Sequence, residues 1–296
     1  MNSFDKVYFK SKVIGRLSSN HLSELKSTLQ NIESDKKKLK SKIISAMKTL
    51  KITESQLSWI NWFPINFLFE EKISLKKQTI LSLKGNLNSL KLDYEKHQLG
   101  LDISLSDRLE AAFGTLDDKF SEIMSTKKVW DVTASQRIDR VIERTTANNT
   151  IERKSVALKR SDNSKILCDY KALHFENANG GDLNIFPQFI FIEHYNDFAL
   201  IDLLDIDIHY TLVSFIESEN VPSDAEVIDQ AWAKANKNGD RDKRFADNYQ
   251  IPVVHYGELH FTSKSGINEV YMFSNPEPAL AFKNMFDEYK KVLAKS

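Results

Sequence analysis

The densest group of side chains that could bind a ligand lies between residues 236 and 248, where the sequence reads NKNGDRDKRFADN. Lysine and arginine side chains can bind phosphate or carboxylate groups, and Arg244 could do so through two parallel hydrogen bonds. An aromatic residue precedes this loop and another lies within it. We therefore expect a ligand or partner to contact Trp232, Asn236, Lys237, Arg241, Arg244 and Phe245.

The same loop allows two other interpretations. Its aspartates could pair with its own arginines, so that the charged groups of the loop have a structural role and bind no ligand. Asn236, Asn238 and Asp240 have the spacing of the first three ligands of a calcium-binding loop. However, the position that requires glycine is Arg241, and the last ligand position is Asp247 instead of glutamate.

Other catalytic patterns are weak. A metal-dependent nuclease needs acidic residues and an acid-x-Lys unit on a strand, and Glu152, Asp169 and Lys171 could supply them. The acid-x-Lys spacing occurs seven times in this lysine-rich chain, however, and neither HExxH, a Walker loop, GxGxxG nor GxSxG is present. The single cysteine, Cys168, excludes an internal disulfide and a thiolate zinc site. We expect no catalytic residue, metal or cofactor.

The composition is that of a folded cytoplasmic protein. The chain has 296 residues, 41% of them hydrophobic, which suggests about two domains at roughly 150 residues each. It contains neither a run of 18 apolar residues nor an apolar N-terminal core, so we expect neither a membrane-spanning helix nor a signal peptide. Residues 1–150 carry a net charge of +7 and residues 151–296 carry −7. The basic half could meet an anionic surface or the protein's own acidic half, and nucleic acid is not an expected partner.

The first half of the chain predicts a pair of long helices. Apolar residues recur at alternating spacings of three and four from Leu22 to Leu57, and again from Ile73 to Leu101. Such a period needs a partner helix to cover it, so we predict an antiparallel coiled-coil hairpin, followed by a third helix over 106–124. Positions a fall on 22, 29, 36, 43, 50 and 57, and positions d on 25, 32, 39, 46 and 53, with Lys36 as the charged exception.

An apolar segment, WINWFPINFLF, lies between the two series at the expected bend of the hairpin. Pro64 should interrupt any helix there. Connections between helices are normally polar, so an apolar tip indicates an interface. Aromatic residues flanked by lysines suit a membrane surface, while packing on a protein or a second subunit is the other interpretation. The tip residues expected to contact a membrane or partner are Trp59, Trp62, Phe63, Phe67 and Phe69.

The second half predicts a β-rich domain. β-branched and aromatic runs separated by turn residues indicate strands at 128–133, 152–159, 165–175, 183–194, 198–218, 251–262 and 268–274, with a bend near 204–206. Ser223 and Glu226 have the spacing of a capping box, which predicts a helix over 223–235. A final amphipathic helix is expected over 276–293.

The expected fold class is therefore α+β. A helical coiled-coil domain over 1–126, with its apolar tip at 59–69, should precede a β-rich domain over 127–296. Strands followed by one closing helix predict a sandwich or a partly open barrel, with the helix over 223–235 inserted and the helix over 276–293 as the closing element.

Several residue groups of the second half resemble a module that recurs in uncharacterised bacterial proteins. They are Trp130-Asp131-Val132, Gly180-Gly181-Asp182, Phe186-Pro187, Trp232, Asn236-Lys237-Asn238-Gly239-Asp240, Arg244-Phe245, Asn248, Ile251-Pro252, Tyr256-Gly257, Gly266-Ile267-Asn268-Glu269 and Phe273-Ser274-Asn275. The strand-strand-helix ending also resembles the pleckstrin-homology-like superfold over about residues 150–294. That resemblance implies binding of a peptide, a protein or a phosphoinositide, while the module carries over no catalytic residue.

These features predict a non-enzymatic bacterial interaction or adaptor protein. A coiled-coil stalk would bind a protein partner or a second copy, and a pleckstrin-homology-like domain would bind a ligand. A defence or stress role is the biological context that the bacterial resemblance suggests. Two alternatives remain: a peripheral membrane adaptor that inserts segment 59–69, and a metal-dependent nuclease.

Overall fold

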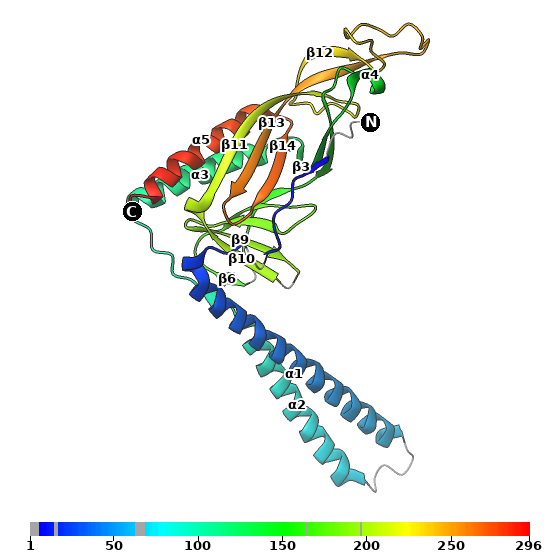
Figure 1. Cartoon of the computed structure of the whole chain (residues 1–296). Helices are drawn as coiled ribbons and strands as arrows, with labels where there is room; N and C mark the ends of the chain where they lie inside the picture. The colour runs from blue at the N-terminus through cyan, green and yellow to red at the C-terminus, as the bar shows by residue number, and fades with distance from the viewer. Residues whose placement is uncertain (1–5, 15–16, 63–68, 164, 196) are drawn as a thin grey trace. The chain divides into compact units, whose positions relative to one another are not determined.

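The computed structural model of the chain describes residues 6–14, 17–62, 69–163, 165–195 and 197–296 (Figure 1). The chain forms two compact units, a helical unit and a β-rich unit, and its fold class is α+β. The helical unit holds Glu24–Leu101 and Asn163–Cys168, while the β-rich unit holds Met1–Ser23, Asp102–Asp162 and Asp169–Ser296. This division differs from the expected boundary after residue 126, because the third helix and the first strand belong to the β-rich unit.

Two long helices make up most of the helical unit, α1 (Ser23–Trp62) and α2 (Glu70–Lys96). Both are rich in residues that favour helix and contain no proline. After α2, strand β2 (Leu99–Gly100) pairs in parallel with β6 (Ile166–Leu167). A short segment that lies between two strands of the β-rich unit in sequence is thereby part of the helical unit.

The least exposed positions of both helices are those of the two apolar series. In α1, every a and d position from 25 to 57 is at least partly buried, and Leu29 is fully buried. In α2, Ile80 and Leu87 are each 8% exposed, whereas Leu81, beside Ile80, is 69% exposed. Burial of one stripe on each helix is the main source of stability for helices of this kind.

Contacts between α1 and α2 pair residues in reverse order along the two helices. Glu54 forms an ion pair with Lys84 at 2.8 Å. The Lys76 ammonium donates a hydrogen bond to the Gln56 carbonyl oxygen at 2.7 Å. Nearer the start of α1, the Lys36 ammonium lies 5.4 Å from the ring centroid of Tyr94. This cation–π contact accommodates the charged residue in the apolar series.

The first prediction concerns this shared stripe. Leu87→Ala should lower the free energy of unfolding of the helical unit by about 2–3 kcal/mol, because it leaves a cavity at a buried position. Leu81→Ala, a matched change on the exposed side of α2, should cost less than about 0.5 kcal/mol. Urea unfolding followed by circular dichroism at 222 nm would measure both. Equal losses would show that the stripe contributes no more than the exposed face.

The main sheet of the β-rich unit contains seven antiparallel strands among the described residues. Its path runs β1-β3-β14-β13-β11, with β4 also paired to β3 and β12 to β13. The strands are β1 (Lys6–Tyr8), β3 (Val129–Arg137), β4 (Asn149–Ser155), β11 (Ile206–Ile216), β12 (Glu226–Trp232), β13 (Gln250–Ser263) and β14 (Asn268–Phe273).

The second sheet has five antiparallel strands in the same described part of the chain, ordered β10-β9-β8-β7-β5. They are β5 (Leu158–Ser161), β7 (Ala172–Phe175), β8 (Asp182–Ile185), β9 (Phe189–His194) and β10 (Asp197–Asp202). The 3-10 turn η4 (Leu203–Asp205) separates β10 from β11, at the bend that the sequence predicted. The Asp202 side chain accepts a hydrogen bond from the Leu204 amide and so starts this turn.

Two helices share the core with both sheets. Helices α3 (Asp107–Met124) and α5 (Pro276–Leu293) lie side by side (Figure 1), at the positions predicted from the sequence. One core cluster combines apolar residues of α3 and α5 with residues of both sheets. A second, smaller cluster lies on the opposite face of the main sheet, around Trp130, Tyr256 and Met272. The main sheet is therefore covered on both faces along part of its width.

The prediction of a helix over 223–235 is wrong, because this segment contains strand β12. Ser223 and Asp224 form a turn instead of a helical cap. The Asp224 carboxylate accepts hydrogen bonds from the Lys127 amide and the Ser274 hydroxyl, at 2.8 Å each. The following residues then pair with the long strand β13, so tertiary pairing overrides the local helix signal.

Candidate functional site

Trp232 ends strand β12, and the other predicted ligand-binding residues lie in the loop between β12 and β13. The buried carboxylate of this loop, Asp242, pairs with arginine side chains. Arg244 donates two hydrogen bonds to the Asp242 carboxylate, from Nε at 2.8 Å and from Nη2 at 2.7 Å. Arg144 adds a third at 3.1 Å. It follows the single helical turn α4 (Arg140–Glu143) and has a left-handed backbone, with φ of 55°. Asp242 is almost completely buried between the two guanidinium groups.

The electrostatics of Asp242 stabilise this loop. The hydrogen bond from the Arg244 side chain, with the charge of Arg144, lowers the pKa of Asp242 from 3.8 to about 2. Because the folded-state pKa lies below the unfolded value, the stabilisation is present above pH 3.8 and is lost as the pH falls toward 2. At neutral pH Asp242 is a permanent anion that neutralises part of the positive charge of the loop.

The other predicted residues also make contacts within the loop or next to it. Arg241 donates to the Ala246 carbonyl at 3.0 Å, and its guanidinium lies 5.5 Å from the ring centroid of Trp232. The Asn236 amide donates to the Arg241 carbonyl at 3.0 Å. Phe245 packs under the guanidinium of Arg144, and Lys237 is exposed. The structure thus brings the predicted residues together in a loop that satisfies most of its own polar groups.

The second prediction tests this loop. Asp242→Asn should speed trypsin cleavage inside the loop at pH 8, because both arginine contacts lose their ionic partner. Asp240→Asn is the matched control, since the Asp240 carboxylate accepts its side-chain hydrogen bond from Asn238 at the exposed turn. Mass spectrometry of early fragments would give the two rates. Similar rates for both variants would contradict the role of Asp242.

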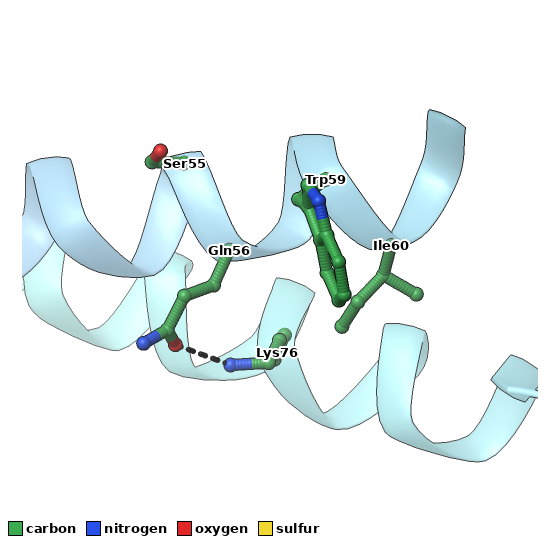
Figure 2. Close-up of a pocket in the computed structure, with 5 residues that line it drawn as sticks. All are labelled: Ser55, Gln56, Trp59, Ile60 and Lys76. Atoms are coloured by element: carbon green, nitrogen blue, oxygen red, sulfur yellow. Dashed lines mark hydrogen bonds between the residues drawn. The ribbon is translucent and has the colours of Figure 1, made fainter. Parts of the chain in front are cut away.

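The far end of α1 exposes large aromatic side chains. Trp59 is 64% exposed and Trp62 is 82% exposed, while Phe69, at the start of α2, is partly buried. A shallow hollow of about 410 Å³ lies here. Its lining residues are Ser55, Gln56, Trp59, Ile60 and Lys76. Figure 2 shows the Trp59 ring and the Ile60 side chain on the α2 side of α1, beside the hydrogen bond between Gln56 and Lys76. Of the predicted tip residues, Phe63 and Phe67 lie outside the described residues.

A group of buried polar residues that the sequence analysis did not single out as a site lies between the sheets. We call Asp131, Asn177, Asn179, Glu269 and Tyr271 the Asp131 cluster. Asp131 on β3 and Tyr271 on β14 are direct neighbours across the main sheet. The Ala178 amide donates to Asp131 at 2.8 Å and the Ser11 amide donates to Glu269 at 2.9 Å. The loop between β7 and β8 and the N-terminal segment therefore meet over the two carboxylates.

The polar atoms of the Asp131 cluster are poorly satisfied. Burial raises the pKa of Asp131 to about 6. The hydrogen bond from Ala178 and the charge of Lys154 both lower this pKa, but by less than burial raises it. Burial also raises the pKa of Glu269, and the nearby Asp131 adds to that effect. Five of the six buried side-chain atoms without a hydrogen-bond partner among the described residues belong to this cluster: Asp131 Oδ1, Asn177 Nδ2, Asn179 Oδ1, Glu269 Oε2 and Tyr271 Oη. Buried polar atoms normally have partners, so this concentration is unusual.

The sequence contained a signal for this cluster that carried no assigned role. Three of the groups that resemble the bacterial module, WDV, GGD and GINE, supply or adjoin its residues. Gly181 has a steric reason to be glycine, because a Cβ atom there would lie 2.7 Å from the Ile192 side chain and 2.8 Å from the Glu193 carbonyl. A Cβ atom at Gly180 would lie 3.1 Å from Asn177 Oδ1, which is a tight contact, and 3.4 Å from Glu269 Oε1, which is an ordinary one.

A buried arginine clamp lies on the outer face of the main sheet. The Arg153 guanidinium lies over the rings of Trp130 and Phe215, at 4.1 and 4.5 Å from their centroids. It pairs with the buried Glu217 at 2.7 Å, and the Tyr256 hydroxyl donates to the same carboxylate at 2.7 Å. The ion pair is satisfied on both sides, which is typical of a structural contact.

The predicted nuclease residues do not form a metal centre. Glu152 on β4 pairs with Lys6, and the Asp169–Lys171 unit lies in the irregular stretch before β7 instead of on a strand. Within the described ranges, no three His, Cys, Asp or Glu side chains are placed to hold a metal ion. No described helix combines the length and apolar character needed to cross a bilayer.

Comparisons with protein families, with curated proteins and with solved structures found no match to this chain. Its function must therefore be argued from its own surfaces and sites.

Proposed function

We propose that this chain is a non-enzymatic interaction protein whose helical unit carries the partner-binding surface. In this proposal α1 and α2 form an antiparallel coiled-coil hairpin. The reverse order of the α1–α2 contacts and the burial of both apolar series support it. Because the seam is covered within the chain, a partner has to use another surface of the helices.

A second stripe on α1, with four apolar residues at six positions, is the observation that carries the proposal. Positions 44, 48, 52, 55, 59 and 62 are three or four residues apart, so they share one side of the helix. At 100° per residue the backbone positions of this side lie away from the buried series, while the Trp59 ring reaches toward Lys76 of α2 (Figure 2). Ile44, Ile52, Trp59 and Trp62 are all exposed on it. A helix with apolar residues on two sides is typical of one that contacts two neighbours.

The size of the exposed side chains makes this stripe a binding surface of useful strength. Full burial of one large apolar side chain contributes about 2–3 kcal/mol. Tryptophans dominate the binding energy of many interfaces, since they combine a large apolar area with one hydrogen-bond donor. Lys48 lies within the stripe and Lys51 lies at its edge, so the surface suits a partner helix with apolar and acidic residues.

The third prediction tests the stripe directly. A photoreactive benzophenone residue in place of Ser55, which lines the hollow beside Trp59, should form a discrete protein adduct in cells. The combined change Trp59→Ser and Trp62→Ser should abolish that adduct while circular dichroism shows unchanged helix content. Denaturing gels and mass spectrometry would detect the adduct and show whether it contains a second copy of the chain.

Two controls accompany this experiment. The combined change Leu81→Ser and Leu92→Ser removes exposed apolar residues from α2 and should leave the adduct intact. A benzophenone residue in place of Lys91, exposed on α2, should give no matching adduct. Absence of any adduct from position 55, or an adduct that survives loss of both tryptophans, would reject the proposal.

A peripheral membrane adaptor is the second candidate, because the exposed tryptophans and basic residues share one end of the helices. The Lys72 ammonium lies 5.6 Å from the Phe69 ring centroid, so cationic and aromatic groups adjoin there. Tryptophan is favoured at the headgroup level of a bilayer, and lysine is attracted to anionic lipid.

The fourth prediction separates lipid from protein. Under the membrane alternative, the wild-type protein floats with vesicles that contain anionic phosphatidylserine, and the double tryptophan variant does not. Under the leading proposal neither protein floats with anionic or neutral vesicles. Flotation at low and high salt would distinguish insertion of the aromatic residues from simple charge attraction.

For the β-rich unit we propose a pleckstrin-homology-like binding domain. Support comes from its ending, in which the antiparallel pair β13–β14 leads directly into the amphipathic helix α5. Helix α5 packs on β11 and β13, as a closing helix would. The ligand-binding role of the loop around Lys237 and Arg241 stays a prediction. Such a domain would bind through loops on a rigid sheet.

A further inference from the structure

The Asp131 cluster has the features of a built site instead of a chance group of acidic residues. Its members come from β3, β14 and the loop between β7 and β8. Asp131, Glu269 and Tyr271 are each at most 1% exposed. The Tyr271 hydroxyl has no hydrogen-bond partner among the described residues. Tyr271 lies opposite Asp131 across the sheet and two residues after Glu269 on β14, so the three side chains lie on the same face of the main sheet.

The unpartnered atoms indicate the chemistry of the ligand. Four of the five are oxygens: two from carboxylates, one from an amide and one from a phenol. Neither Asp131 nor Glu269 forms an ion pair in the described part of the chain. The basic group that acts on Asp131 is Lys154, whose own side chain is exposed. Two buried carboxylates without a counter-ion carry a desolvation penalty, which a bound cation would offset.

We infer that the Asp131 cluster binds one divalent cation of the calcium type. Calcium takes six to eight oxygen ligands in irregular geometry and accepts carboxylates, amide carbonyls and water together. Asp131, Glu269 and Asn179 would be the protein ligands, with water completing the shell. Magnesium suits the site less well, because it demands a regular octahedron and keeps most of its own water.

The remaining two residues have supporting roles in this site. The Asn177 carbonyl oxygen accepts hydrogen bonds from the Asn179 and Gly180 amides, at 2.9 and 2.5 Å, so its amide nitrogen is held in one orientation. That nitrogen and the Tyr271 hydroxyl would donate to the ligand carboxylates. Such outer contacts orient metal ligands and tune their affinity. With two acidic ligands in place of three or more, the site lacks the usual sequence pattern of a metal centre.

Bound calcium would join segments that are distant in sequence. Ser11 from the N-terminal segment donates to Glu269, and the Asn179 side chain donates to the Phe9 carbonyl at 2.9 Å. The cation would therefore stabilise the docking of this segment and of the loop between β7 and β8 on the main sheet. Because binding requires the folded state, it should raise the thermal stability of the full chain.

The fifth prediction is a calcium titration of the full-length protein after dialysis against EDTA. Isothermal titration calorimetry at pH 7.5 should give one calcium ion per chain, and calcium should raise the melting temperature. Asp131→Asn and Glu269→Gln should each weaken binding by about tenfold or more, because each removes a charged ligand. Glu258→Gln, which alters a shielded carboxylate on β13 outside the cluster, should leave binding unchanged.

Each other outcome overturns the inference. Absence of binding at millimolar calcium would mean that protonation or water satisfies the carboxylates. Equal affinity in the wild type and both amide variants would place calcium elsewhere, and equal affinity for magnesium would reject a calcium-type site. The amide variants keep the shape of the side chains and remove a buried charge, so they should fold. If Asp131→Asn does not fold, Glu269→Gln alone decides the result.

Discussion

The ring of Phe175 lies where both sheets and both long helices of the β-rich unit meet. Its centroid is 5.4 Å from Phe120 of α3, 5.2 Å from both Phe261 of β13 and Tyr271 of β14, and 5.8 Å from Phe282 of α5. Protein interiors are close-packed, so none of these elements can shift without opening a gap at this point. The Asp131 cluster depends on the same contact, because Tyr271 packs its ring on Phe175 and lies opposite Asp131 across the main sheet.

The elements that the sequence predicted correctly are those with a local period. The buried residues of helices α3 and α5 recur at helical spacing. In α1 and α2, the partly or fully buried residues are mainly those of the two apolar series that the sequence predicted. Strand β12 was missed because its Ser-x-x-Glu pattern is a local signal, whereas its pairing with β13 is not. The turn at Asp224 depends on Lys127 and Ser274, which are distant in the sequence.

The candidate sites show the same division between local and long-range information. The loop at 236–248 could be found because its charged residues are neighbours in sequence, but the pairing of Asp242 with Arg144 involves a residue 98 positions away. The Asp131 cluster could not be assembled from spacing, since its carboxylates lie on strands that meet only in the folded sheet. In the sequence, its glycines and acidic residues were recognised only as parts of a recurring pattern. They became a candidate site only because the folded sheet places them close together.

The hydrogen bond between Ser11 and Glu269 spans 258 residues and has a consequence for the order of events during synthesis. Helices α1 and α2 contact each other across a short stretch of chain, so they can pair soon after they leave the ribosome. The N-terminal segment is made before both of its partners, because β1 pairs with β3 and Ser11 donates to Glu269 on β14, the last strand among the described residues. The contact with Glu269 can therefore form only after α1 and α2 have been made. It is among the last contacts that the β-rich unit gains.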